Sequence, residues 1–194
     1  MIALPAAPAP ARPRTLLVGG ALACAGAAML FGSMLGIYLT IRDGHGGTTA
    51  AWVPKGVTIP EIQSNIMLVI MVFISVLVQW ARWSLVREDR THTYMALGLT
   101  TLFAVGVLNA QVFIWRQMGL AVRGGPYQSM FYAITGTFFA AVVAGIVLLL
   151  VCGFRALGGR IGRRHAESVT LVALYWHFLT AAFAAIWLVV YVVK

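Results

Sequence analysis

The sequence predicts an all-α membrane protein, a bundle of five transmembrane helices. Of its 194 residues, 61% are hydrophobic and only 10% are charged, which leaves too little polar surface for a water-soluble domain. The mean hydropathy of +0.90 agrees with this. Five apolar runs are also long enough to cross the hydrocarbon core of a bilayer, which takes about 20 residues. These runs are 15–41, 62–81, 93–115, 129–154 and 168–193.

The first run, 15–41, follows a Pro- and Ala-rich stretch of residues 1–14 that we expect to be a flexible cytoplasmic tail. The basic residues of this tail, the apolar run and the small residues around Cys24 are similar to a signal peptide. However, no charge interrupts the run from Thr15 to Ile41, so it is far longer than a signal-peptide core. We therefore expect a first membrane span that remains in the protein.

The other four runs are separated by short connections, so we expect residues 15–194 to form one transmembrane domain. Only the loop after the first run, with its Gly and Pro residues, has room to cover a neighbouring helix. Tryptophan and tyrosine are enriched where helices leave a membrane. Such residues mark the ends of the later runs: Trp80, Trp83, Tyr94, Trp115, Tyr127, Trp187 and Tyr191.

The basic residues predict the orientation of the bundle. Nine of the fourteen Lys and Arg residues lie in the first 14 residues or near the second-to-third and fourth-to-fifth connections. Since positive charges in short loops stay in the cytoplasm, the amino terminus is predicted to be cytoplasmic and the carboxy terminus outside. The net charge of +9 is thus a topology signal, and we expect no nucleic-acid partner, because the charges do not cluster among exposed aromatics.

Small residues recur at helical spacing within the runs. Gly32 and Gly36 form a GxxxG pair, and Gly136 is followed by Ala140 and Ala144. Such stripes let helices approach closely in a membrane. We interpret them as packing or lipid-contact positions, either within this chain or against another subunit.

Ionisable residues are scarce at membrane depth, which argues against catalysis and ion-coupled transport. All five acidic residues lie between the runs or at their ends: Asp43, Glu61, Glu88, Asp89 and Glu167. His177 is the one histidine inside a run, whereas an intramembrane haem needs two axial ligands. We therefore expect no catalytic, metal-binding or cofactor-binding residue here. The simplest interpretation of His177 is that its side chain forms a hydrogen bond with a neighbouring helix.

Several short motifs, taken in order along the chain, resemble subunit III of the haem-copper terminal oxidases, the cytochrome c and quinol oxidase family. The most specific is YWHF, residues 175–178, in the last run. The others occur in the order that the family has. They are Tyr38 with Arg42, Trp52 with Pro54, Gln111 with Trp115 and Arg116, and Phe131, Tyr132, Thr135 and Gly136. The chain is identified as a divergent, five-helix bacterial member of this family.

The departures from the family pattern share one property, the loss of buried acids and histidines. They are Ala27 and Ile114 in place of glutamates, Phe138 and Ala141 in place of histidines, and Thr180 in place of an aspartate. These losses argue against a role in delivering protons, and scaffolding and lipid binding are left as the roles that the resemblance implies.

The resemblance implies an accessory, non-catalytic subunit of a respiratory oxidase that reduces oxygen to water and pumps protons across a bacterial plasma membrane. Haem and copper would lie in partner subunits, with subunits I and II as partners and phospholipid bound to this chain. A larger respiratory supercomplex is a further possible partner. Five residues would act as internal polar and aromatic fasteners: Tyr38, Gln111, Thr135, Trp176 and His177. Phospholipid would lie near Gly32 and Gly36.

Three alternatives stay open at this point. A small permease would need a polar path, for which the runs offer only scattered Ser, Thr, Asn and Gln residues. A haem-bearing, quinone-linked membrane anchor would need one of the eight methionines as the second axial ligand. A subunit III-like partner of a nitric oxide reductase-type complex would also be compatible with the missing acids.

Overall fold

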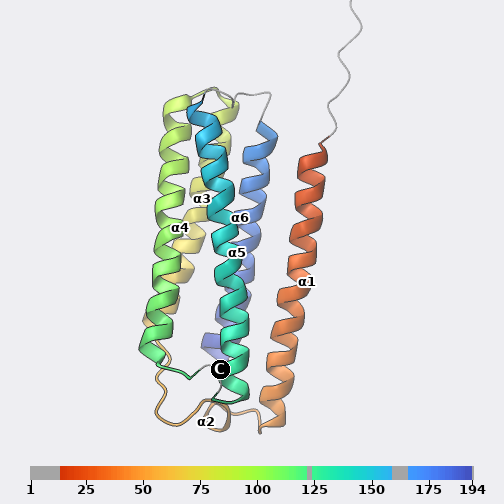
Figure 1. The fold of residues 1–194 in the computed structure, drawn as a ribbon, viewed down its shortest axis with the longest axis vertical. Helices are drawn as coiled ribbons and strands as arrows, with labels where there is room; N and C mark the ends of the chain where they lie inside the picture. The colour runs from red at the N-terminus through yellow and green to blue at the C-terminus, as the bar shows by residue number, and fades with distance from the viewer. Residues whose placement is uncertain (1–13, 122–123, 159–165, 194) are drawn as a thin grey trace, which may run out of the picture.

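The computed structural model describes residues 14–121, 124–158 and 166–193, and this part of the chain is helical with short connections (Figure 1). Apart from Arg14, the predicted tail lies outside the described residues. The elements are α1 (Thr15–Gly44), α2 (Thr49–Trp52), α3 (Glu61–Val86), α4 (Arg90–Met118), α5 (Pro126–Leu157), α6 (Ala166–Ile186) and the π-helical segment η2 (Trp187–Val193). Within these ranges, five helices are long and apolar enough to cross a membrane, which confirms the predicted fold class.

The helices are longer than the apolar runs that predict them. The run 62–81 lies within α3 (Glu61–Val86), and the run 93–115 lies within α4 (Arg90–Met118). A helix of 29 residues such as α4 is about 43 Å long, whereas the hydrocarbon core is about 30 Å thick. Apolarity ends where the hydrocarbon ends, but the backbone hydrogen bonds continue into the interface, so each run is shorter than its helical span, the last span being α6 together with η2.

Four helices form a closed ring, and α1 lies against its outside. Helix α3 packs on α4, α4 on α5, α5 on α6, and α6 back on α3, while α1 contacts α6 and α5 (Figure 1). The core between the ring helices is apolar and aromatic. Helix α1 buries one narrow stripe, made of Cys24, Phe31, Leu35 and Tyr38. Helices α5 and α6 are therefore the central ones, because each contacts three other long helices.

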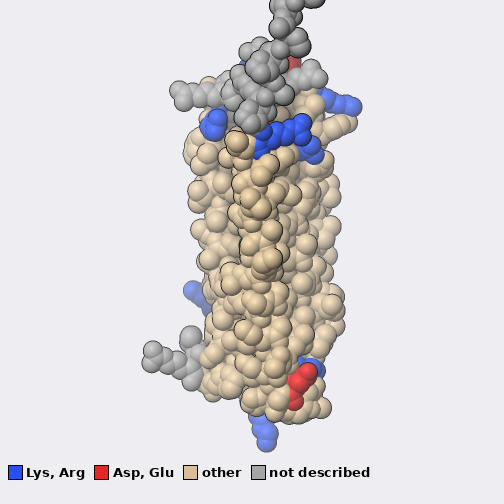
Figure 2. All heavy atoms as spheres, turned by 90° about the vertical axis from the view of Figure 1, so that its right-hand side faces the viewer, with Lys and Arg blue, Asp and Glu red and all other residues tan. Residues whose placement is uncertain are grey.

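On the face drawn in Figure 2, most charged side chains lie toward the two ends of the bundle, and the surface between them is built mainly from other residues. The start of α1, the α3–α4 turn and the end of α5 share one end, and α2, the end of α4 and η2 share the other (Figure 1). This distribution is typical of a bundle that spans a bilayer. The predicted orientation of the termini stays a prediction.

The turn between α3 and α4 stops one helix and starts the next within a few residues. Glu88 has a left-handed φ of 62°, which reverses the chain after α3. Asp89 is the N-cap of α4, and its Oδ1 accepts a hydrogen bond from the backbone N–H of His92 at 3.2 Å. At its other end α4 stops at Gly119, where a φ of 56° is easily adopted by glycine.

We expect the Asp89 cap to make stability depend on pH. The hydrogen bond from the His92 backbone N–H, with that from the His92 ring, lowers the pKa of the Asp89 carboxyl below its ordinary 3.8. A lowered pKa in the folded state means that the ionised cap stabilises the fold above about pH 4, and that this contribution is lost as the pH falls through the folded pKa. Asp89→Asn should keep the cap and remove this dependence, because asparagine caps helices without titrating. The free energy of unfolding in mixed micelles, compared at about pH 6 and about pH 3, measures this dependence. An unchanged pH dependence in the variant would contradict the assignment.

Candidate functional site

A line of hydrogen bonds joins α3 to the last span, and we call it the α3–α6 seam. The two helices are antiparallel, and the seam consists of hydrogen bonds at three positions along them. The Trp187 indole N–H donates to Asn65 Oδ1 at 2.7 Å, the Thr180 hydroxyl donates to the Met71 carbonyl at 3.0 Å, and the His177 ring bonds Ser75 and Gln79. Helices in lipid gain little from burying apolar surface, so interhelical hydrogen bonds of this kind help to fix their register.

His177 lies in the seam with both ring nitrogens engaged. Its Nε2 lies 3.4 Å from Gln79 Oε1, and its Nδ1 bonds the Ser75 hydroxyl. A carbonyl oxygen can only accept, so the proton belongs on Nε2, and Ser75 then donates to Nδ1. The arrangement suits a neutral imidazole. The hydrogen bond to a neighbouring helix that the sequence suggests is therefore present, while the role of His177 as a fastener stays a prediction.

The partners of His177 were not predicted from the sequence. Ser75 and Gln79 are four residues apart and Asn65 lies further along the same face of α3, so helical spacing was a usable signal. Thr180, which the sequence presents only as a departure from a family pattern, bonds across to α3 as well as to the Trp176 carbonyl of its own helix. A threonine hydroxyl is thus enough to join the helices at this position.

Trp176 of α6 is fully buried and packs closely against α5 at Gly145. A Cβ added at Gly145 would lie 3.0 Å from Trp176 Cζ2 and 3.0 Å from Tyr175 Cε1. The Tyr175 ring is itself held, because its hydroxyl donates to the Ala141 carbonyl at 2.7 Å. Gly145 is therefore the glycine that admits these two rings.

The glycines singled out in the sequence are not points of close approach in the described chain. A Cβ at Gly32, Gly36 or Gly136 would meet nothing within 4 Å, whereas one at Gly20 would overlap Leu171 of α6, 1.9 Å away. Within the described chain these three residues therefore make no close helix contact, because spacing alone does not tell which face of an apolar helix meets a neighbour. Contact with lipid or another subunit stays a prediction for them.

Thr135 joins α5 to α4. Its hydroxyl accepts a hydrogen bond from the Trp115 indole N–H at 3.0 Å and donates to the Phe131 carbonyl at 2.7 Å. Each partner in this chain of bonds is satisfied within the protein. Thr135 therefore occupies the kind of position expected of a fastener, and its effect on stability stays a prediction.

Tyr38 and Gln111 belong to one buried group of side chains, which we call the Tyr38 cluster. Its members come from α1, α2, α4, α5 and η2: Tyr38, Trp52, Gln111, Tyr127 and Tyr191. The indole of Trp52 lies edge-on between two tyrosine rings, with centroids 5.4 Å from Tyr38 and 5.6 Å from Tyr127. From the sequence, Tyr127 and Tyr191 are expected at the membrane interface, and their meeting with Tyr38 is not predicted.

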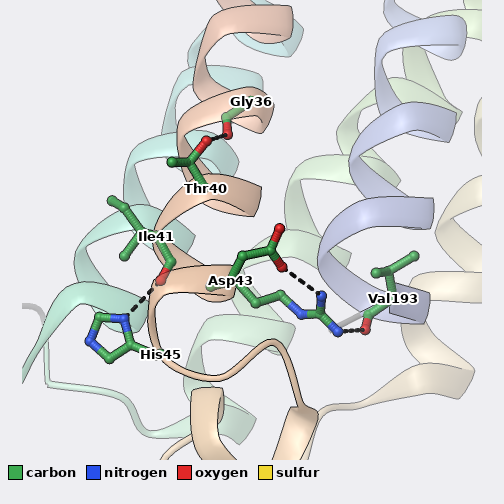
Figure 3. A network of polar contacts seen from close by, with 7 residues as sticks. Gly36, Thr40, Ile41, Asp43, His45 and Val193 are labelled. Atoms are coloured by element: carbon green, nitrogen blue, oxygen red, sulfur yellow. Dashed lines mark hydrogen bonds and ion pairs between the residues drawn. The ribbon is translucent and has the colours of Figure 1, made fainter.

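Helix α1 is tied to the last span at both ends. At its start the Leu17 backbone N–H donates to Glu167 Oε1 at 3.0 Å, which also puts a carboxylate at a helix amino terminus. At its other end Arg42 Nη2 donates to the Val193 carbonyl at 3.2 Å and pairs with Asp43 at 3.6 Å (Figure 3). These contacts help to hold α1 against the bundle, although only a narrow stripe of the helix is buried.

The acidic side chains all lie at helix ends. Asp43 is in the last turn of α1, Glu61 begins α3, Glu88 and Asp89 precede α4, and Glu167 is in the first turn of α6. Among the described residues, no three His, Cys, Asp or Glu side chains come together in a set that could hold a metal ion. Both cysteines, Cys24 and Cys152, are buried as free thiols.

The fold and these contacts define a multi-pass helical membrane protein whose polar side chains join helices to one another. Comparison with known proteins identifies its family. A model of the family described as cytochrome c oxidase subunit III matches residues 18–194. The chain belongs to this family, and the resemblance inferred from its motifs is confirmed.

Individual relatives agree with the family assignment. The chain is 29% identical over 147 residues to cytochrome c oxidase subunit 3 of Bos mutus grunniens, which covers 73% of this chain and 54% of the relative. Over 148 residues it is 27% identical to the protein of the same name from Drosophila yakuba, covering 73% and 55%. The chain spans about half the length of the curated relatives it matches.

Proposed function

We propose that the chain is the accessory, non-catalytic subunit III of a respiratory haem-copper oxidase in a bacterial plasma membrane. The complex would reduce oxygen to water and pump protons, with haem and copper in partner subunits. This chain would pack beside subunit I, in a complex that also contains subunit II, and would stabilise it. The observation that carries the proposal is the family match over residues 18–194. The position of every acidic side chain at a helix end supports the non-catalytic part.

Bound phospholipid is part of the same proposal. An apolar groove of about 280 Å³ lies between α4 and α5, and its lining includes Tyr94, Gly98, Leu149 and Phe154. Such a groove suits an acyl chain. The open surface beside Gly32 and Gly36 on α1 is a second location that would suit one. Lipid analysis of the purified complex, before and after detergent exchange, would test whether lipid is retained.

The proposal is tested by purifying the protein in mild detergent through a tag on the amino-terminal tail. We expect haem a or haem o absorption and a large multi-helix subunit to purify with it. A colourless protein that purifies alone, from cells in which it is expressed at its natural level, would overturn the assignment to an oxidase. The identity of the co-purifying chains also tests the larger respiratory assembly.

The hydrogen bonds of the α3–α6 seam predict how the loss of His177 would affect the activity of the complex. We expect His177→Ala to leave the initial rate of oxygen consumption nearly normal and to shorten the time over which activity is lost during turnover. The reason is that the variant loses its bonds to α3, and interhelical hydrogen bonds are each worth only about 1–2 kcal/mol or less. Oxygen-electrode traces of the purified complex measure both quantities.

Ser75→Ala is the matched variant, since it removes one of the same bonds from the α3 side and leaves the imidazole in place. It should shift the inactivation time in the same direction and by less. If His177→Ala abolished the initial rate while the complex stayed assembled, His177 would have a role in turnover itself, and the purely structural assignment would be wrong.

A further inference from the structure

The Tyr38 cluster carries polar atoms that the described protein does not satisfy. The unpaired atoms are the hydroxyls of Tyr38, Tyr127 and Tyr191, the indole N–H of Trp52, and both amide atoms of Gln111. The exposed fractions of these five residues lie between 0% and 4%, so bulk water does not reach them. An unpaired buried donor or acceptor costs about 1–3 kcal/mol, and nearly all such groups in proteins bond protein or ordered water.

These atoms lie close together. Trp52 contacts both Tyr38 and Tyr127, and Phe131 contacts both Tyr127 and Tyr191, with ring centroids 5.4–6.2 Å apart. The Gln111 amide lies near the Tyr191 hydroxyl and the Trp52 indole near the Tyr38 hydroxyl, at the limit of hydrogen-bonding reach and without the geometry of a hydrogen bond. The Tyr127 hydroxyl lies near the hydroxyls of Tyr38 and Tyr191. The unpaired atoms therefore face one small region where five elements of the fold meet.

We propose that the Tyr38 cluster binds ordered water. A tyrosine hydroxyl donates and accepts, the indole only donates, and the Gln111 amide does both at separate atoms. Water complements all three, because a buried water typically makes about three hydrogen bonds and can switch between donor and acceptor. The set contains no carboxylate, imidazole or thiolate, which are the side chains that hold metal ions most strongly. Water is thus the ligand class that fits the chemistry.

A pocket adjoins the cluster on one side. A pocket of about 390 Å³ lies at this end of the bundle and is lined by Glu61, Ser64, Asn65, Trp187, Tyr191 and Val192. Tyr191 belongs to both the pocket and the cluster. The cluster also lies near the membrane interface, since Tyr38 is six residues, about 9 Å, from the end of α1. Water from this pocket would reach the cluster past the Tyr191 ring, without crossing the hydrocarbon.

The bound water has a structural consequence. It would connect the end of α1 and the short helix α2 to α4, α5 and η2, beside the hydrogen bond that Arg42 of α1 donates to the Val193 carbonyl. The inference concerns this chain's own side chains and does not depend on the proposed function.

Radiolytic hydroxyl labelling tests the proposal on the intact protein, purified in mild detergent with any chains that accompany it. X-ray pulses generate hydroxyl radicals from water wherever it is bound, so buried side chains beside water are labelled and dry ones are not. Rates are normalised to those of the denatured chain, which removes differences in intrinsic reactivity between residue types. We expect labelling of Trp52, Tyr127 and Tyr191 several-fold above that of Phe138 and Phe183, a buried ring pair whose centroids are 5.0 Å apart.

A variant locates the water. Gln111→Leu should lower labelling at Tyr127 and Tyr191, because it removes two polar atoms that hold the water. Thr100→Val is the matched control on the same helix, since the Thr100 hydroxyl is buried but bonds the Ala96 carbonyl of its own turn. It should leave labelling of the cluster unchanged. Labelling of the wild-type cluster at the level of Phe138 and Phe183 would overturn the proposal, whether or not the variants assemble, and would mean that the side chains bond one another directly.

Discussion

Trp176→Ala should lower the free energy of unfolding of the subunit by about 3–5 kcal/mol, the usual cost of truncating a large buried aromatic residue. Trp176 is 0% exposed and is among the largest side chains of the core. Its removal leaves a cavity between α5 and α6 that neighbouring side chains cannot fill without moving. Unfolding by SDS in mixed micelles, followed by helical circular dichroism, measures the loss.

The matched variant is Trp176→Phe. The indole N–H of Trp176 has no hydrogen-bond partner among the described residues, so phenylalanine loses packing volume but no hydrogen bond. We expect a loss clearly smaller than that of the alanine variant. If the two variants were equally destabilised, the N–H would have to matter, and a partner outside the described part of the chain would be indicated.

Gly145→Leu should lower the free energy of unfolding by about 1–3 kcal/mol, as overpacking of a tight core does. Even a Cβ at this position would lie 3.0 Å from two aromatic rings, and the Tyr175 ring is fixed by its bond to the Ala141 carbonyl. The helices must therefore move apart. The same unfolding titration, together with the fraction of the subunit retained in the purified complex, measures the effect.

Gly136→Leu is the control, because it lies on the same helix and a Cβ there meets nothing within 4 Å. It should cause no loss, and it can stabilise the helix, since glycine is unfavourable in a helix interior by about 1 kcal/mol. Equal losses at the two positions would mean that glycine itself, rather than the contact with α6, is required in α5. Coupling between Gly145→Leu and Trp176→Ala would further locate the effect, since removing the ring makes room for the leucine.

Much of the fold could be predicted because the bilayer imposes simple rules. A span must be apolar over the hydrocarbon thickness and must satisfy its own backbone, which leaves the helix as the available structure for such a chain. This fixes the number of helices and the approximate position of each one. The amino-terminal ends of α4 and α5 can also be recognised in the sequence, since Asp89 caps α4 and Pro126 begins α5.

The candidate site was only partly predictable. His177 stands out because an imidazole is costly in a membrane and needs a partner. Its partners Ser75 and Gln79 do not stand out, since isolated small polar residues are common in membrane helices and can bond their own backbone. The Tyr38 cluster is harder still, because its five members lie on five elements and only the folded chain brings them together.

The sequence by itself determined the class of this protein, its five spans and its membership of the subunit III family, because hydrophobic length and a few ordered motifs carry that information. Only the tertiary structure decided which residues meet. Gly145 rather than Gly136 faces α6, and Tyr38 meets Trp52. The physical reason is that lipid and protein interior are about equally apolar, so the hydrophobic pattern does not orient a helix about its axis. That rotation is set by close packing and by hydrogen bonds between helices.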